Sequence, residues 1–124
     1  MEEWKIKVAV LWLVWIVSFV IHMMFLLFEP GGIEQISMQL TPELMLFAAI
    51  LMLVPLVMAF LSLTLKDSIN RLANVVLGIV YTGICLFDWI GSPVQPALHI
   101  LMYISHIVAS ALIVWYAWNS KKLA

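Results

Sequence analysis

The sequence predicts an all-α integral membrane protein, a four-helix up-down-up-down bundle with both termini in the cytoplasm. Its composition leads to this fold class: 65% of the 124 residues are hydrophobic, 10% are charged, and the mean hydropathy is +1.12. A water-soluble domain of this size carries far more polar surface. The apolar stretches leave too little chain for a separate soluble core, so we expect a single transmembrane domain over residues 1–124.

Four stretches are long and apolar enough to cross a bilayer, which takes about 20 residues in a helix. They cover, approximately, residues 8–28, 44–65, 72–90 and 97–118. Each is continuously apolar, whereas the strands of a membrane β-barrel alternate polar with apolar residues. The first stretch is too long for the core of a signal peptide, so we expect it to remain as a membrane anchor.

The basic residues predict the orientation of these spans. All six lie before the first span, between the second and third, or after the fourth: Lys5, Lys7, Lys66, Arg71, Lys121 and Lys122. The opposite side carries only acids, which are Glu29, Glu34, Glu43 and Asp88. Because Lys and Arg stay on the cytoplasmic side, we expect a multi-pass protein of the cell membrane with cytoplasmic N and C termini. Aromatic residues near the lysines predict an inner belt at Trp4, Trp115, Tyr116 and Trp118.

The connections between the spans differ in length. Those at residues 66–71 and 91–95 are short, which makes consecutive helices antiparallel. The connection at residues 29–43 is longer, and its Ile33, Ile36 and Leu40 could form one face of a short interfacial helix. Pro55, in the middle of the second span, predicts a kink, which is either a packing bend or a hinge.

Polar residues within the spans recur at helical spacing. The first span carries Ser18 and His22, the third Tyr81 and Asp88, and the fourth His99, Tyr103, His106 and Ser110. If these stripes converge, they line a polar cavity open to the outer side. Two other interpretations stay open: the stripes form hydrogen bonds between helices, or Asp88 and His99 face lipid headgroups.

The sequence gives few signs of cofactor binding or catalysis at this cavity. Two histidines on different helices, His22 and His106, could hold a haem or a transition metal, although no cofactor is expected. No catalytic motif is present, so enzymatic activity has no support. The net charge of -1, without a basic run, excludes nucleic acid as a partner, and a single cysteine excludes an intramolecular disulfide.

Short motifs run through the chain: NRLAN at residues 70–74 followed by Gly78, LIVWYAW at 112–118, LW at 11–12 and LVP at 53–55. Over its whole length the chain resembles an uncharacterised prokaryotic family of small four-helix membrane proteins, loosely similar to DoxX-like proteins. The resemblance implies the fold and no particular activity.

Two functions are therefore weighed. The first is binding or permeation of a small molecule or ion in the outer cavity, with membrane lipids as partners and a homodimer supplying further helices. The second is an accessory or structural role without a ligand of its own, in which the polar stripes only hold the helices together. Binding of haem or metal by histidine is a third possibility.

Overall fold

The structure is a computed structural model that describes residues 2–91 and 97–120, and these residues form five helices and no strand. The helices are α1 (Glu3–Phe28), α2 (Gly32–Gln39), α3 (Pro42–Thr64), α4 (Asp67–Gly91) and α5 (Ala97–Trp118). All except α2 are long and apolar enough to cross a membrane. The predicted fold class, an all-α bundle of four membrane helices, is confirmed.

Two helices extend beyond the apolar stretches that predicted them. In α1 the first turn is charged, and Lys7 pairs with Glu3 at 3.0 Å, one helical turn away. In α4 the first turn begins at Asp67, where an acidic side chain favours the positive end of the helix dipole. Both additions are polar helical turns that continue out of the hydrocarbon region, which hydropathy alone does not detect.

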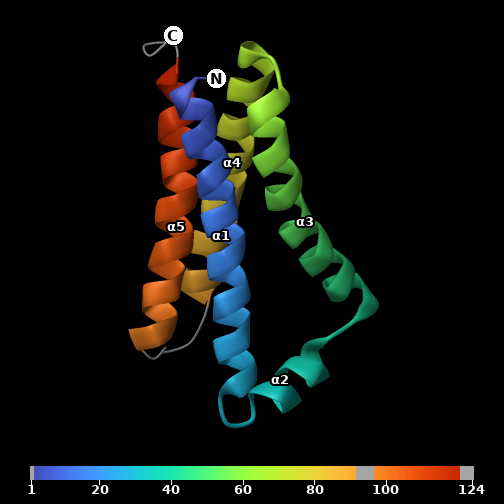
Figure 1. Ribbon diagram of the computed structural model, residues 1–124. Coiled ribbons are helices and arrows are strands. Elements are labelled where there is room, and N and C mark those ends of the chain that lie inside the picture. The colour runs from blue at the N-terminus through green and yellow to red at the C-terminus, as the bar shows by residue number, and fades with distance from the viewer. Residues whose placement is uncertain (1, 92–96, 121–124) are drawn as a thin grey trace.

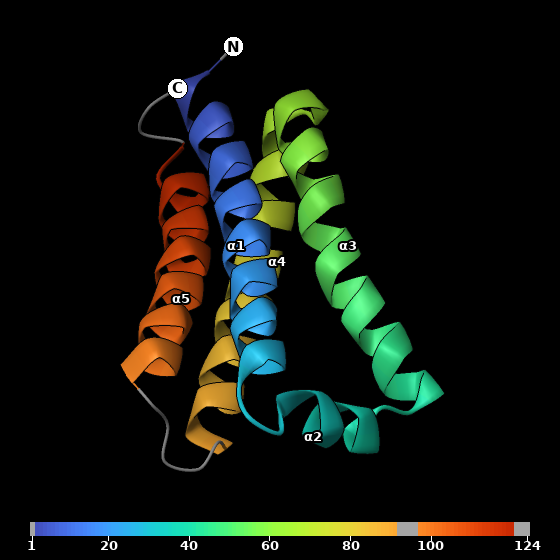
Figure 2. The same ribbon diagram turned by 60° about the horizontal axis from the view of Figure 1, so that its bottom comes forward.

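The long connection contains a short helix, as the sequence predicts. Gly31 adopts a left-handed conformation, with φ of 76°, and turns the chain from α1 into α2. Thr41 then caps α3, because its hydroxyl accepts a hydrogen bond of 3.1 Å from the Leu44 amide. As a result α2 lies across one end of the bundle between α1 and α3 (Figure 2).

The helices are not evenly packed. The first and last, α1 and α5, lie side by side, α4 packs along α5, and α3 packs on α1. Although a two-residue turn joins α3 to α4, these two helices touch little. Figures 1 and 2 show α3 leaning away from α1 as it approaches α2. The bundle is therefore close at one end and spread at the other.

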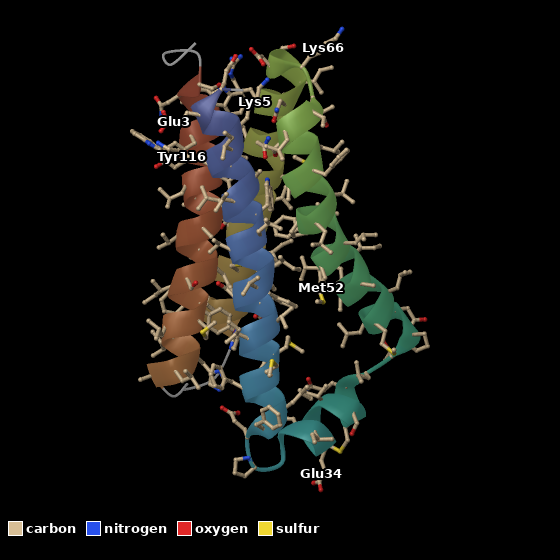
Figure 3. The ribbon with its side chains drawn as sticks, viewed as in Figure 1. Glu3, Lys5, Glu34, Met52, Lys66 and Tyr116 are labelled. Atoms are coloured by element: carbon tan, nitrogen blue, oxygen red, sulfur yellow. The ribbon has the colours of Figure 1, made fainter. Side chains whose placement is uncertain are left out.

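The two ends differ in charge as well. Lys5 and Lys66 lie at one end, which we call the lysine end, and Glu34 lies at the other (Figure 3). We call the second the histidine end, since His22 and His99 lie in that half of α1 and α5. At the lysine end Lys5 pairs with Asp67 at 2.5 Å. Lys121 and Lys122, and residues 92–95 of the predicted outer turn, lie outside the described residues.

The apolar core fills the half of the bundle near the lysine end. Val8 and Trp12 of α1 and Ile113 of α5 are fully buried there. Gly78 allows α4 to approach α5, because a Cβ atom at this position would lie 2.6 Å from the Val114 side chain. Trp4 is also in this core, 2% exposed, so the prediction that it belongs to an aromatic belt at the lipid surface is wrong.

Most other large apolar side chains point outward. Trp115 and Trp118 are 60% and 70% exposed near the lysine end, as an aromatic belt requires. Exposed Leu, Ile, Val and Phe residues cover the outer faces of all four long helices. Such a surface is suited to lipid, which supports a multi-pass membrane protein.

A buried polar network joins three helices beside the apolar core. The side-chain oxygen of Asn74 accepts hydrogen bonds from Trp12 at 2.7 Å and from Ser62 at 3.2 Å. Asn70, one turn earlier in α4, donates to the Ser62 carbonyl at 2.8 Å and accepts from Asn74 at 2.6 Å. Since all four side chains are fully buried, the network fixes α1, α3 and α4 relative to one another.

Replacing Asn74 should therefore loosen the lysine end. We expect Asn74→Leu to lower the free energy of unfolding by about 1–3 kcal/mol, because it leaves buried donors of Trp12 and Ser62 without an acceptor. The measurement is equilibrium unfolding by sodium dodecyl sulfate in mixed micelles. Asn119→Leu is the matched control, since the Asn119 side chain donates to the Trp115 carbonyl in its own turn of helix. Equal stabilities of the two variants would contradict a joining role for Asn74.

Candidate functional site

A cavity of about 810 Å³ lies in the half of the bundle near the histidine end. It occupies the space where α3 separates from α4, with α1 and α5 behind it and α2 at its end. Most of its wall is apolar and includes Phe19, Leu44, Phe47, Ala48, Leu51, Ile84 and Phe87. Phe47 and Phe87 are 51% and 82% exposed, so they form the exposed rim of the cavity.

Polar side chains gather on one part of this wall. His22 of α1, Asp88 of α4, and Tyr103 and His106 of α5 all line the cavity. The Tyr103 hydroxyl donates to the Asp88 carboxylate at 2.8 Å. The His22 ring lies 5.0 Å from the Tyr103 ring and 5.5 Å from the His106 ring, between centroids. Four of the eight predicted site residues are thus together at the cavity.

Two nitrogen atoms on cavity-lining residues are buried without a hydrogen bond. They are Nε1 of Trp15 and Nε2 of His106. The Ser18 carbonyl lies near the His106 ring, yet Nε2 forms no hydrogen bond with it. A buried polar atom without a partner costs about 1–3 kcal/mol, so such atoms are uncommon in folded proteins. Both nitrogens are packed behind the cavity surface, Trp15 near the Cys85 thiol and His106 near the Ser18 carbonyl, so a molecule in the cavity would reach them only after side chains move.

A chain of hydrogen bonds connects the cavity to the surface. Nε2 of His22 lies 3.0 Å from Nδ1 of His99, and Nε2 of His99 bonds the Glu29 carboxylate. His22 and His99 are 5% and 4% exposed, whereas the Glu29 side chain is 41% exposed. His99 itself does not line the cavity. The chain thus runs from the cavity wall through His99 to an exposed carboxylate.

Sequence reasoning did not place Glu29 in the site. Its signal was present, because Glu29 follows His22 by seven residues and so lies on the same face of α1. Because Glu29 follows the last residue of α1 and lies in a turn with Pro30, the sequence predicts a loop residue at this position.

The other predicted site residues bond between helices instead. The Ser18 and Ser105 hydroxyls lie 3.0 Å apart across α1 and α5. Ser110 donates to the His106 carbonyl at 3.0 Å and accepts from Thr82 of α4 at 2.9 Å. Neither Ser18 nor Ser110 lines the cavity. Ser18 and Ser110 therefore hold helices together through hydrogen bonds.

Tyr81 also lies outside the cavity lining, where it compensates for Pro55. Proline has no N–H, so Pro55 leaves the Leu51 carbonyl without its helical partner. The Tyr81 hydroxyl donates to that carbonyl at 2.9 Å. The Tyr81 ring contacts Trp12 and Trp15 edge-on, with centroids 5.4 and 4.9 Å away. This bond ties α3 to α4 beside the cavity.

The whole chain, residues 1–124, matches the family described as "Family of unknown function (DUF6326)". The chain belongs to this family. No curated protein and no solved structure matches the chain. Membership of an uncharacterised family is thereby confirmed for this DUF6326 protein, while its looser likeness to DoxX-like proteins and its prokaryotic origin stay predictions.

Metal and haem binding stay predictions for this DUF6326 protein. Among the described residues, no group of three or more His, Cys, Asp or Glu side chains is arranged to hold a metal ion. Of the predicted histidine pair, His22 uses Nε2 in its bond to His99, and His106 keeps Nε2 without a partner.

The bond from Tyr81 to the Leu51 carbonyl predicts a coupling between Tyr81 and Pro55. Tyr81→Phe should lower the free energy of unfolding by about 1–2 kcal/mol, because the carbonyl then has no donor. In a Pro55→Ala background the same change should cost close to nothing, since the new amide supplies the helical bond. A double-mutant cycle of unfolding in mixed micelles measures the difference. Additive effects would show that the hydroxyl does not serve the proline.

Proposed function

We propose that this protein binds a small amphiphilic molecule that enters its cavity from the lipid. One observation carries the proposal: an 810 Å³ cavity is lined mainly by apolar side chains and has the polar side chains of His22, Asp88, Tyr103 and His106 in its wall. Small-molecule sites commonly measure about 300–1,000 Å³ and combine apolar walls with a few polar groups. The cavity has both properties.

The positions of the two kinds of residue define the ligand. Phe47 and Phe87 form an exposed rim at the level of the bilayer, which suits the entry of an apolar body from the lipid. The polar head then meets His22, Asp88 and His106, whose side chains line the cavity. This differs from the polar cavity predicted from the sequence, because α3 contributes Leu44, Phe47, Ala48 and Leu51 to its wall.

An accessory or structural role is the alternative, and a specific observation favours it. The hydroxyl groups of Ser18, Tyr81 and Ser110 form hydrogen bonds between helices. A purely structural protein would satisfy its polar groups in this way throughout. The cavity and the polar residues in its wall favour ligand binding over that role.

A homodimer remains a proposal that lacks a defined surface. Small residues at helix surfaces often mediate contacts between membrane helices. Ala59 and Ala109, however, are 8% and 3% exposed, which places them between helices of the same chain. A second copy would have to use the outer apolar faces.

We place both termini on the cytoplasmic side, with the histidine end outside. The described basic residues, Lys5, Lys7, Lys66 and Arg71, lie in the first turns of α1 and α4 or between α3 and α4, at the lysine end, and Lys121 and Lys122 follow α5 in the sequence. Cytoplasmic connections carry this excess of positive charge.

Reporter fusions test the orientation. Green fluorescent protein joined to either terminus should fluoresce, and alkaline phosphatase at either terminus should be inactive, because the first folds in the cytoplasm and the second outside it. Moving the charges provides the control: replacing Lys66 and Arg71 by Gln should weaken the preference. Active phosphatase at both termini of the unaltered chain would invert our assignment.

Filling the cavity tests the proposed function. A Cβ atom at Gly83, which lines the cavity, meets nothing within 4 Å, so Gly83→Phe places a ring in the cavity without a clash at its root. We expect native mass spectrometry to find a small-molecule adduct on the unaltered protein. The adduct is either dodecanol that was added to the sample or a molecule retained from the membrane. Gly83→Phe should lose that adduct and keep its helicity.

The matched control is Val76→Phe, which adds a ring on the 49% exposed, outer side of the same helix. It should retain the adduct. If Gly83→Phe retains the adduct as well, the molecule binds outside the cavity and the proposal fails.

A further inference from the structure

We propose that the cavity binds a lipophilic amine, which enters as a cation and is held as a neutral amine, and that its proton leaves through His22, His99 and Glu29. This inference rests on the proposed binding of an amphiphile in the cavity. It adds the chemical class of the head group and the path of one proton.

The hydrogen-bond chain sets the positions of its own protons. A carboxylate accepts, so Nε2 of His99 carries the hydrogen that bonds Glu29. Nδ1 of His99 is then an acceptor, and Nε2 of His22 donates to it across 3.0 Å. We therefore assign Nδ1 of His22 as a bare acceptor on a ring that lines the cavity.

A cationic head group can release a proton into this chain. The ammonium N–H donates to Nδ1 of His22, and the proton passes to that nitrogen. His22 gives its Nε2 proton to Nδ1 of His99, and His99 gives its Nε2 proton to the Glu29 carboxylate. Glu29, with a side chain 41% exposed, releases one proton to water. The balance is one ammonium ion converted to one neutral amine and one proton outside.

The same chain returns to its first state when the ligand leaves. After one transfer both rings carry their hydrogen on Nδ1, so a second proton cannot follow in the same direction without rotation of the rings. Reprotonation of the amine runs each step backward and restores the original tautomers. The arrangement is therefore matched to reversible binding of one amine rather than to a continuous flow of protons.

The charges at this end favour a cationic ligand. Glu29, Glu34, Glu43 and Asp88 lie there, and the sequence between residues 8 and 65, and between 72 and 120, contains no Lys or Arg. Carboxylates at the mouth of a cavity raise the local concentration of cations. Inside the cavity the apolar wall disfavours a charged head, so loss of a proton stabilises the bound amine.

The groups that face His22 come from several elements. His99, His106 and Tyr103 approach it from α5, Asp88 from α4, and Glu29 from the end of its own helix. The stretch of α3 that lines the cavity, from Leu44 to Leu51, contributes apolar side chains, and α2 contributes Ile36 and Gln39 to the lining. Among the described residues, the carboxylates facing His22 are Asp88, which accepts a hydrogen bond from Tyr103, and the receiving Glu29.

Three probes with the same chain length distinguish binding of an amine from binding of any amphiphile. They are dodecylamine, which can lose a proton, dodecyltrimethylammonium, which cannot, and neutral dodecanol. Each is titrated into the protein in phosphatidylcholine nanodiscs, with Gly83→Phe nanodiscs subtracted. Calorimetry in two buffers of different ionisation enthalpy counts the protons released. We expect one proton per dodecylamine, an affinity for dodecylamine that rises about tenfold per pH unit, and binding of dodecyltrimethylammonium at least about tenfold weaker.

The rate of proton release tests the proposed path of the proton. Stopped-flow mixing with a pH dye in weak buffer should show that Glu29→Gln slows proton release from bound dodecylamine at least about tenfold, because the last proton acceptor of the chain is removed. Glu34→Gln removes another carboxylate at the same end and should leave the rate unchanged. A rate that Glu29→Gln does not alter would overturn the path.

The outcomes separate this inference from the proposed function. If dodecanol binds but dodecylamine releases no proton, or if dodecyltrimethylammonium binds as tightly as dodecylamine, the amine proposal is wrong and the amphiphile site stands. If none of the three probes binds more than it does to Gly83→Phe, the amphiphile site itself is wrong.

Discussion

The buried amide of Asn74 is the constraint on which the shape of this bundle depends. Within a bilayer, apolar side chains gain little by leaving lipid for a helix interface, so polar bonds and close packing decide which helices stay together. Asn74 accepts from Trp12 and Ser62 and thereby joins three helices at one level. Together with Gly78, which lets α4 approach α5, it makes the lysine half a close-packed support.

The cavity follows from where these bonds end. Beyond Asn74, α3 has one further side-chain bond to α4, from Tyr81 to the Leu51 carbonyl. Past Leu51 toward α2, the described residues show no side-chain bond between the two helices, and the space between them is the cavity. Pro55 is responsible for the position of that last bond, because it is the proline that leaves the Leu51 carbonyl available. Pro55 therefore determines where the core ends and the cavity begins.

The spans could be predicted from the sequence because bilayer thickness fixes the length of an apolar run. The polar stripes also identify which faces of α1, α4 and α5 turn inward, since seven of the eight predicted site residues are buried and only Asp88 is exposed. Spacing along one helix does not say which residue of a neighbouring helix lies opposite. For that reason the sequence predicts Ser18 and Ser110 in the cavity and Glu29 in a loop, whereas the two serines bond between helices and Glu29 bonds His99. The lean of α3 had no signal, since its apolar sequence shows no distinct face.

The residue types along the relay suit their depths. A carboxylate within the hydrocarbon region would either remain costly as an ion or take up a proton and hold it. An imidazole is neutral and carries one donor and one acceptor, so it can accept a proton on one nitrogen and release another from the opposite nitrogen. His22 and His99 occupy the buried positions, and the carboxylate of Glu29 is at the exposed end. Charge is then needed only where water can solvate it, which is the arrangement required to carry a proton between an apolar cavity and the surface.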